Sequence, residues 1–355
     1  MTEWKEYKLG EIVTFQRGHD LPKDKMIDGD IPVAGSNGII GYHNQFTKEG
    51  PGVTIGRSGN IGIPHYYPNA YWAHNTVLYI VDFKGNDAKF MYYLLKTFDF
   101  TQLNTGSAVP SLNRNHIHGL HVSIPDVPTQ RRIAAILSSL DDKIDLLHRE
   151  NATLEQMAET LFRQWFVVEA KEEWEESQFA EAIEVFDYLR RPLSKMERDK
   201  MKNGEQLYPY YGAAEIMDYI DSYLFDGEYI LMGEDGTVKT DDGYPILQYA
   251  TGKFWPNNHA HVLQAKSPYN NCFIWNYLKI TNIESIVTGA VQPKINQANL
   301  LSLPFYKYPI KLVEMYMRIT DDWWSKIMMN NKQIQTLIQT RDGLLPRLMG
   351  GEVKV

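Results

Sequence analysis

The stretch Gln130-Arg-Arg-Ile-Ala-Ala-Ile-Leu-Ser-Ser-Leu-Asp-Asp-Lys-Ile-Asp-Leu-Leu147 has the spacing of a long amphipathic helix. Its apolar or small residues, and those that follow, recur at alternating intervals of four and three, which is the heptad pattern of helices that pack along one another. Asn151 interrupts this seam with a polar side chain, which suits a role in fixing the register of a helix pair at some cost in stability. The pattern predicts one helix over residues 130–166. The seam positions are Ile133, Leu137, Leu140, Ile144, Leu147, Leu154, Ala158 and Leu161.

The same seam returns near the end of the chain, 183 residues later, where Leu140 corresponds to Trp323 and Asn151 to Ile334. Pro128 and Pro309 stand just before the two helices, where proline is tolerated. Because both copies carry the heptad, we expect the helices to pack against each other; the alternative is that each packs only on its own domain. The matched positions in the second copy are Trp323, Ile327, Ile334, Leu337 and Leu344.

The region before each helix is also duplicated in the sequence. The turn Gly56-Arg-Ser-Gly59 matches Gly233-Glu-Asp-Gly236 at a distance of 177 residues, and Thr105-Gly106 matches Thr288-Gly289 at 183. Matches that keep one order while their offset drifts indicate a duplication with loop insertions and deletions. The same 177-residue distance separates Pro32, Gly35, Ile39 and Tyr42 from Pro209, Gly212, Ile216 and Tyr219.

Short strands and short helices fill the two repeats. Val53-Thr-Ile55, Thr76–Val81 and Tyr229-Ile-Leu231 are typical of strands, whereas Phe90–Lys96 and Cys272–Leu278 are typical of helices. The fold class is therefore α/β, with two mixed α/β domains and an internal repeat.

Composition limits the chemistry of the chain. The net charge is −8, which argues against a protein that holds nucleic acid by itself through a basic surface; if the chain does bind DNA, a few placed residues or partner proteins must supply the positive charge. The single cysteine, Cys272, excludes an internal disulfide and a cysteine-based zinc site. The sequence shows no apolar run of membrane-spanning length and no signal stretch, so we expect a cytoplasmic protein without a membrane partner.

Several motifs together resemble the specificity subunits of type I restriction-modification enzymes. They are the Gln130–Leu147 stretch, Leu161-Phe-Arg-Gln-Trp-Phe166, the tail Leu344-Leu-Pro-Arg-Leu-Met-Gly-Gly-Glu352 and the opening Trp4 to Ile12. The resemblance covers essentially the whole chain. The second helix departs from the family pattern, because Trp323-Trp324 and Met328-Met329 replace the usual charged and aliphatic mix, which leaves its detailed packing open.

The resemblance implies a domain order and an architecture. Residues 1–127 and 170–309 would form two target-recognition domains, and residues 128–169 and 310–355 a central and a C-terminal conserved helix. The two long helices would form an antiparallel coiled coil that separates the domains. The two halves of the chain would be related by an internal pseudo-twofold repeat.

The resemblance also implies a function without chemistry of the chain's own. Such a subunit reads a bipartite, asymmetric site in double-stranded DNA and positions two modification subunits, which carry S-adenosylmethionine and methylate adenine. Restriction subunits would add ATP- and Mg-dependent translocation and cleavage. The setting would be the cytoplasm of a bacterium or archaeon, in association with the nucleoid. No cofactor and no metal is expected on this chain.

The absence of two catalytic motifs from the sequence supports this expectation. The sequence has neither the Asn/Asp-Pro-Pro-aromatic motif of an adenine methyltransferase nor a G-x-x-x-x-G-K-[ST] phosphate loop. Pro125-Asp126 followed by Asp141-Asp-Lys143 formally matches a metal-nuclease pattern, but the second group falls on a helix and is expected to face outward. His116 and His118 would share a strand face, with His121 nearby, yet no carboxylate partner completes a zinc site.

Base reading in the major groove needs side chains with paired donors and acceptors, held on loops between rigid strands. The two glycine-bounded turns are the first candidates, and a polar loop before each long helix is the second. In the first domain the candidates are Ser36, Asn37, Arg57, Ser58, Asn60, His74, Asn75, Ser107, Ser111, Asn113, Arg114 and Asn115. In the second domain they are Glu234, Asp235, Thr237, Lys239, Lys253, Gln292, Lys294, Asn296 and Gln297.

The helix seam supplies a further set of predicted contact residues, at the subunit interface: Leu140, Ile144, Leu147, Leu154, Leu161, Ile327, Ile334, Leu337 and Leu344. Two other functions stay open at this point. One is a fused methyltransferase or nuclease, which would transfer methyl groups without partners. The other is a coiled-coil scaffold whose domains read no DNA, which sequence-specific protection of DNA would exclude.

Overall fold

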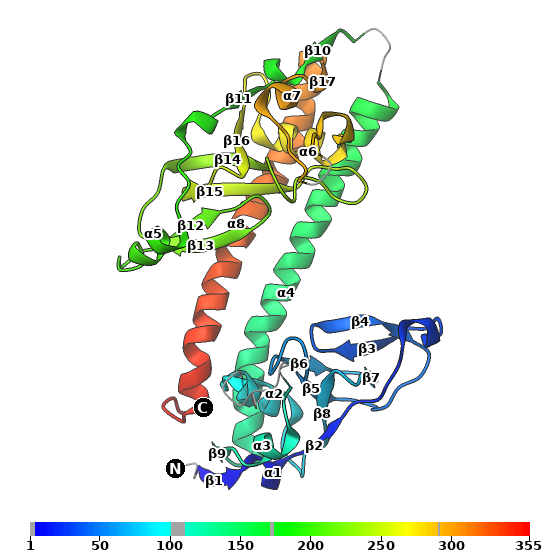
Figure 1. Cartoon of the computed structure of the whole chain (residues 1–355), viewed down its shortest axis with the longest axis vertical. Helices are drawn as coiled ribbons and strands as arrows, with labels where there is room; N and C mark the ends of the chain where they lie inside the picture. The colour runs from blue at the N-terminus through cyan, green and yellow to red at the C-terminus, as the bar shows by residue number, and fades with distance from the viewer. Residues whose placement is uncertain (1–3, 101–110, 171–173, 290–291) are drawn as a thin grey trace. The chain divides into compact units, whose positions relative to one another are not determined.

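The computed structural model describes residues 4–100, 111–170, 174–289 and 292–355 (Figure 1). The chain divides into two compact units. Unit 1 contains Met1–Leu147 together with Lys332–Val355, and unit 2 contains His148–Asn331. The division into four segments at residues 127, 169 and 309 stays a prediction, because each long helix contributes to both units.

The described residues of unit 1 form three small sheets with helices against them. Strand β1 (Lys5–Lys8) pairs with β9 (His121–Ile124) in a two-stranded antiparallel sheet. The four-stranded sheet has the order β2 (Thr14–Arg17), β8 (Val77–Asp82), β5 (Gly52–Gly56), β6 (Pro64–Tyr67). The three-stranded sheet has the order β4 (Gly38–His43), β3 (Ile31–Gly35), β7 (Trp72–Ala73). The remaining elements are α1 (Leu9–Ile12), the short 3-10 helix η1 (Lys23–Lys25), α2 (Ala88–Lys96) and α3 (Arg114–His118).

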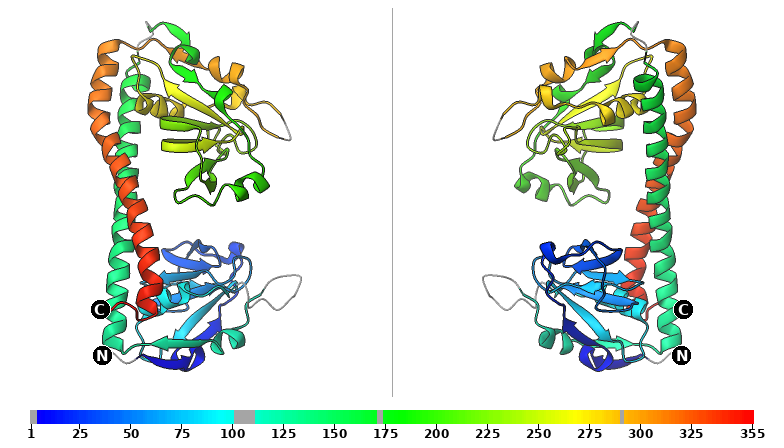
Figure 2. Two further views of the ribbon diagram at one scale, coloured as in Figure 1. Left: turned by 90° about the vertical axis from the view of Figure 1, so that its left-hand side faces the viewer. Right: turned by 90° about the vertical axis from the view of Figure 1, so that its right-hand side faces the viewer.

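Helix α2 shows why these residues fold as they do. Asp87 caps its first turn, because the carboxylate accepts from the backbone N–H of Phe90 at 2.9 Å. Apolar residues at helical spacing, including Phe90 and Leu94, then turn inward and are buried against β5 and the start of the long helix α4. Figure 2 shows the strands of unit 1 on one side of its long-helix segments.

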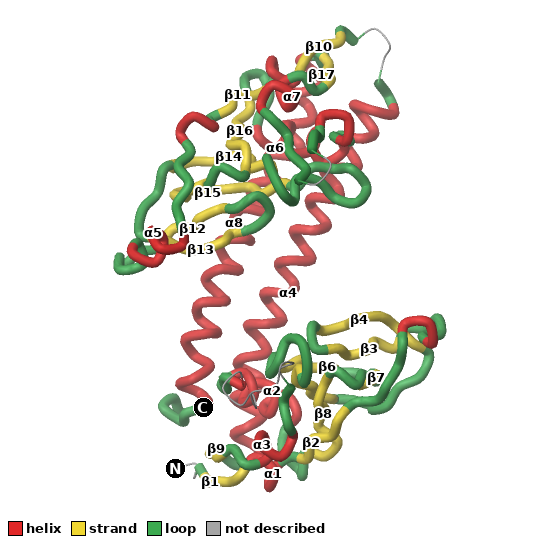
Figure 3. Tube along the Cα trace, viewed as in Figure 1, coloured by secondary structure: helices red, strands yellow, loops and turns green. Residues whose placement is uncertain are grey.

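Unit 2 has one six-stranded sheet, and β10 pairs with β17 separately. The sheet order is β11 (Ile183–Val185), β16 (Ala260–Ala265), β14 (Phe225–Gly233), β15 (Leu247–Pro256), β12 (Tyr208–Tyr211), β13 (Ile216–Ile220). The other elements are β10 (Glu176–Gln178), β17 (Pro304–Tyr306), α5 (Lys195–Lys200), α6 (Asn271–Ile280), α7 (Gln297–Leu301) and the 3-10 helices η4 (Phe179–Glu181), η5 (Asp187–Leu189) and η6 (Glu284–Ile286). Figure 3 separates these strands and helices by colour.

The predicted duplication is confirmed in the strand pairing. Strand β3 lies parallel to β7 with Val33 opposite Trp72, and β12 lies parallel to the end of β15 with Tyr210 opposite Trp255. The hairpin that follows is also built alike in both copies. A side chain at Gly35 would collide with Ile40, and one at Gly212 with Met217, 177 residues on in each case. Glycine is needed at both positions because the facing strand folds its side chain over the backbone.

The two long helices are α4 (Val127–Arg163), continued by the π-helical turn η3 (Gln164–Val168), and α8 (Ile310–Met349). Helix α4 begins at Val127, so Pro128 lies in the first turn rather than before the helix, whereas Pro309 does directly precede α8. Proline is accommodated in a first turn because the missing N–H has no helical partner there.

Each unit contains an antiparallel pair of helix segments. In unit 1, Ile144 and Leu147 of α4 pack with Ile334 of α8, and Arg341 reaches back to Asp141. In unit 2, Asn151 contacts Asn331, and the Tyr316 hydroxyl donates to the carbonyl of Ala158 at 3.1 Å. The expected pairing of the helices is therefore present inside both units, while the coiled-coil geometry stays a prediction.

Two local predictions are wrong. The residues around His116 and His118 form helix α3, not a strand, because Asn113 caps the segment by accepting from the backbone N–H of Asn115. Asp141 does not face outward: its carboxylate binds both Arg341 and the Tyr93 hydroxyl, at 2.8 Å and 2.6 Å.

The unusual residues of the second helix have a packing role. Trp324 is 9% exposed and lies edge-on against Tyr249, with ring centres 4.7 Å apart, next to Trp275. The departure from the family pattern at this point therefore fills the contact between α8 and the sheet of unit 2. Among the residues described, no helix is both long and apolar enough to cross a bilayer.

Candidate nucleic-acid interface

Arg57 and Glu234 occupy the same backbone position in the two repeats. The N–H of Arg57 donates to the carbonyl of Thr76 at 2.8 Å, and its own carbonyl accepts from Leu112 at 2.8 Å. The N–H of Glu234 donates to His259 and its carbonyl accepts from Ile295, again at 2.8 Å in both cases. The turn that follows β5 in unit 1 and the turn that follows β14 in unit 2 are thus bonded in the same way. Each is hydrogen-bonded to the residue just before a neighbouring strand of its sheet, β8 or β16, and to the second predicted loop of its unit.

The next residue continues this equivalence. Ser58 forms an isolated bridge with Ser111, and Asp235 forms one with Lys294. In each unit the two predicted reading loops are therefore joined side by side by main-chain hydrogen bonds. The main-chain frame is the same in both units, and the side chains on it differ.

Three loops meet at the turn of unit 1. The Arg57 guanidinium donates from Nη1 to the carbonyl of Asn75 at 3.2 Å, and the Asn75 amide donates to Asp20. Ser36, in the turn between β3 and β4, lies against Gly56 and Gly59. Burial and then the neighbouring Arg17 lower the pKa of Arg57, which still stays positively charged at neutral pH.

The other candidates of unit 1 are placed around this meeting point. His74 bonds through its backbone to Ala34 and through its ring to Thr76. Asn113 uses its side chain to cap α3, so its exposed neighbours Arg114 and Asn115 are better placed to reach a ligand. Asn37 and Asn60 are exposed, and Ser107 lies outside the described residues.

In unit 2 the acidic turn residues are already partnered. Arg190 donates to Glu234 Oε2 at 2.5 Å, and Lys294 Nζ lies 3.4 Å from Glu234 Oε1. Asp235 pairs with the His259 ring. Carboxylates that are held by cations in this way are less free to accept from a base.

The remaining candidates of unit 2 differ in how far they are engaged. Lys239 pairs with Glu284 at 3.0 Å, and Lys253 lies over the Tyr223 ring at 4.5 Å, where the Tyr223 hydroxyl raises the pKa of Lys253. Asn296 caps α7 by accepting from the backbone of Asn299. The exposed candidates are Thr237, Gln292, Lys294, Asn296 and Gln297.

Sequence reasoning missed three residues beneath these loops, namely Asp187, Arg190 and His261. Asp187, Glu234 and His261 bring one ligand atom each within 4.8 Å of one another. Arg190 lies among them, paired with both carboxylates, and the His261 ring nitrogens face Asp187 and the carbonyl of Ile295. The donors are thus engaged within the chain, which fits an ion-pair network better than a metal site. Their positions in the sequence give no motif by which to find them.

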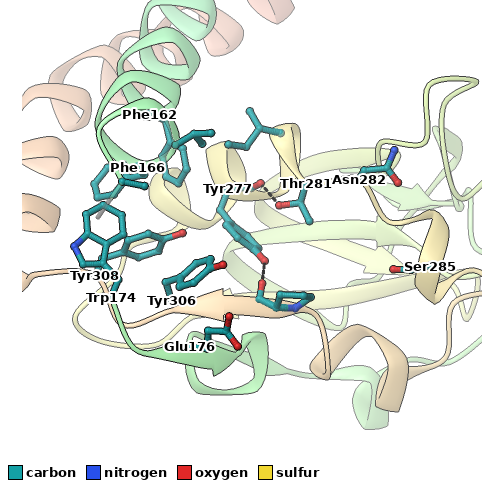
Figure 4. Close-up of a pocket in the computed structure, with 14 residues that line it drawn as sticks. Phe162, Phe166, Trp174, Glu176, Tyr277, Thr281, Asn282, Ser285, Tyr306 and Tyr308 are labelled. Carbon is teal, nitrogen blue, oxygen red and sulfur yellow. Dashed lines mark hydrogen bonds between the residues drawn. The ribbon is translucent and has the colours of Figure 1, made fainter. Parts of the chain in front are cut away.

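A cavity of about 710 Å³ lies elsewhere in unit 2, between the end of α4, α6 and β17 (Figure 4). Aromatic rings such as those of Phe166 and Tyr308 line it, and the Tyr277 hydroxyl donates to the carbonyl of Pro304. The described residues that line the cavity include no lysine or arginine, the side chains that bind phosphate most often, so we do not assign them to the nucleic-acid interface.

The nine seam residues predicted at the subunit interface are all buried or partly buried within the units. Their packing partners lie in this chain; for instance, Leu154 and Ile327 join the core of unit 2, and Leu344 that of unit 1. A role in contacts with other subunits stays a prediction.

The model of the type I restriction modification DNA specificity domain matches residues 1–156 and again residues 171–312, which together make up most of the chain. The chain belongs to the type I restriction-modification specificity family. Its two matches coincide with the two repeats seen in the strand pairing. As a specificity subunit, the chain is not itself an enzyme.

Relatives in this family have been described in bacteria and archaea. The MjaIX specificity subunit of Methanocaldococcus jannaschii is 24% identical over 308 residues, which are 78% of this chain and 71% of that protein. A Haemophilus influenzae protein named as a type I specificity subunit is 38% identical over 113 residues, or 32% of this chain. That alignment spans only 29% of the Haemophilus protein.

The fold of this chain is similar to that of a solved structure. The S subunit of a type I restriction-modification system from M. genitalium superposes with a TM-score of 0.62, over 98% of this chain and 96% of that one. The sequence identity is 17%, so the likeness concerns the fold alone.

Proposed function

We propose that this chain is the DNA-reading subunit of a type I restriction-modification complex, and that it reads two different half-sites. Each domain of the specificity family would recognise one half-site with its two joined loops. The chain would add no catalytic step, because its role is to select the DNA that partner subunits act on.

The observation that carries the proposal is a pair of matched frames with different side chains. Arg57 and Glu234 have main-chain partners at equivalent positions of the two repeats, and the bridge Ser58–Ser111 is replaced by Asp235–Lys294. A guanidinium favours guanine, whereas a lysine contacts guanine or phosphate. Such exchanges on a constant backbone change the bases that fit without changing the fold.

Partner subunits supply the chemistry in this proposal. Two modification subunits would bind S-adenosylmethionine and methylate adenine in the two half-sites. Restriction subunits, where the system has them, would use ATP and Mg for translocation and cleavage. The acidic chain would need the positive charge of these partners to hold DNA, since its net charge is −8. The complex would act in the cytoplasm, on the nucleoid.

Mapping methylated adenines in the source cell, with and without this chain, tests the proposal. We expect one split motif that disappears when the chain is removed and returns when it is restored. Replacing Arg57 by alanine should then relax the first half-site and leave the second unchanged, which also shows that the variant is folded and assembled. A motif that persists without the chain would refute the proposal. Methyl transfer by the purified chain alone would instead indicate a fused methyltransferase.

A further inference from the structure

A connected series of charged side chains lies under the two reading loops of unit 2. Arg190 Nη1 donates to Glu234 Oε2 at 2.5 Å, and Glu234 Oε1 lies 3.4 Å from Lys294 Nζ. The side chains of Arg190 and Glu234 are 12% and 13% exposed, whereas that of Lys294 is 51% exposed. The series therefore begins inside the domain and ends at the surface with the Lys294 ammonium.

Arg190 is fixed from several directions. Its Nη1 also donates to the carbonyl of Ala260 at 2.7 Å, and its Nη2 lies 3.3 Å from Asp187 Oδ2. Asp187 in turn accepts from the N–H of Val262 at 2.9 Å, and its other oxygen lies 2.5 Å from the His261 ring. The guanidinium thus has one position, set by strand β16 and the 3-10 helix η5.

His261 connects this base to the second reading loop. Its ring is 1% exposed, with Nδ1 toward Asp187 and Nε2 at 2.9 Å from the carbonyl of Ile295. Ile295 follows Lys294 directly, and its N–H donates to Glu234. Both loops are therefore attached, through main chain and side chain, to the same buried group of charges.

From this arrangement we infer that Arg190 is a positioning residue for DNA recognition, acting through Glu234 on Lys294. The inference rests on the proposed function and deepens it. Glu234 is held by a cation at each oxygen, so its carboxylate orients Lys294 instead of reading a base. Lys294 presents the group that contacts a phosphate or a guanine edge. Arg190 keeps the carboxylate in place, because a buried carboxylate without its partner is strongly disfavoured.

The first domain is built differently at the equivalent positions. Strand pairing places Leu78 where unit 2 has His261, and Ser111 where it has Lys294. The network is therefore a property of the second domain. Disturbing it should alter one half-site and spare the other, which makes the first half-site an internal control for folding and assembly.

The test uses the full complex, methylated-adenine mapping, and binding to a duplex that carries the mapped site. Lys294→Gln should weaken binding about 10-fold, reduce the salt slope by about one and relax one position of the second half-site. Arg190→Lys, which keeps the charge but loses the forked geometry, should relax the same position of the second half-site. The double variant R190K/K294Q should bind no more weakly than K294Q, because both changes act on one contact. Lys279→Gln, on helix α6, is the matched control and should bind like the unmodified chain.

Glu234→Gln separates positioning from reading. If Glu234 only orients Lys294, the variant relaxes one position of the second half-site without a new preference. A new preferred base with E234Q, additive losses in R190K/K294Q, or equal relaxation of both half-sites would overturn the inference while leaving the proposed function intact. Absence of site-specific methylation by the unmodified complex would overturn both.

Discussion

Arg341 of helix α8 donates from Nη1 to Asp141 Oδ1 of helix α4 at 2.8 Å. The second oxygen of the same carboxylate accepts from the Tyr93 hydroxyl of α2 at 2.6 Å. Leu348 and Met349, a little further along α8, are buried in the core of unit 1. The last residues of the chain are thus part of the first domain, although some 200 positions separate them from its helix α4 partners.

Replacing Arg341 by glutamine should lower the free energy of unfolding by about 1 kcal/mol, because Asp141 loses a charge-assisted hydrogen bond. The pair is 20% and 27% exposed on its two sides, so solvent screening keeps the loss modest. Urea unfolding measures the change. Arg347→Gln is the matched control: its side chain is 59% exposed and 3.8 Å from Glu352, and we expect almost no effect. Equal losses in the two variants would contradict the role given to Arg341.

The buried asparagines of unit 2 should stabilise the unit as a hydrogen-bonded set. Asn151 donates to Asn331 and accepts from Asn330, both at 2.8 Å, and Asn330 is fully buried. Asn151→Leu should cost about 1–3 kcal/mol, because the Asn330 amide loses a partner in a place without solvent. The double variant N151L/N330L should regain most of that loss, since apolar pairs often match buried polar ones in stability. Urea unfolding of the three proteins tests this; a neutral single variant would refute it.

The long helices should set the spacing between the two half-sites. Removing residues 142–148 from α4 and 334–340 from α8 shortens each helix by about 10 Å, at about 1.5 Å per residue. That length corresponds to about three base pairs, at about 34 Å per DNA turn. Methylated-site mapping should show the same half-sites with a shorter unread spacer. An unaltered spacer in a folded, active complex would argue against this role.

Stability should fall as the pH rises above 10. Burial raises the pKa of Tyr211 and of Tyr277 to about 12. In the unfolded chain these phenols ionise near 10, so between the two values the unfolded state has lost protons that the folded state keeps. Each phenol therefore favours the folded state fully below pH 10, and this contribution is lost as the pH rises toward 12. The expected loss is about 1 kcal/mol per tyrosine at pH 11.

Urea unfolding between pH 8 and 11.5, with absorbance of the tyrosinate at 295 nm, measures this dependence. Tyr277→Phe removes one of these buried phenols and should give a shallower fall, even though it starts from a lower stability because the hydroxyl's bond to Pro304 is lost. A fall just as steep in the variant would show that Tyr277 does not titrate as described.

Several features of the fold follow from local patterns. The heptad over Gln130–Leu147 predicts a long helix because apolar spacing of three and four fits only that backbone period. The recurrence of Gly35 as Gly212 predicts the repeat, since both glycines are needed where a facing side chain covers the strand. The turn around Arg57 is equally visible, because its bounding glycines mark a tight connection between strands.

Other features depend on residues that are distant in the sequence. The local pattern alone does not place His116 on a helix or a strand. The cap by Asn113 that starts helix α3 competes with strand pairing, and only the folded chain decides between them. The sequence likewise does not reveal that Asp141 is paired, because its partners, Tyr93 and Arg341, come from other elements. A heptad indicates which side of a helix is apolar, but it does not indicate which polar residues beside it are met by other parts of the fold.

By itself, the sequence determined the repeat, the two long helices and the two pairs of loops that we propose to read DNA, because each is encoded by spacing within a short window. Only the tertiary structure decided that Glu234 is held from below by Arg190 and that Lys294 is the end of that network at the surface. The physical reason is that charge pairing depends on distance in space and on burial, and neither is recorded in the order of residues along one segment.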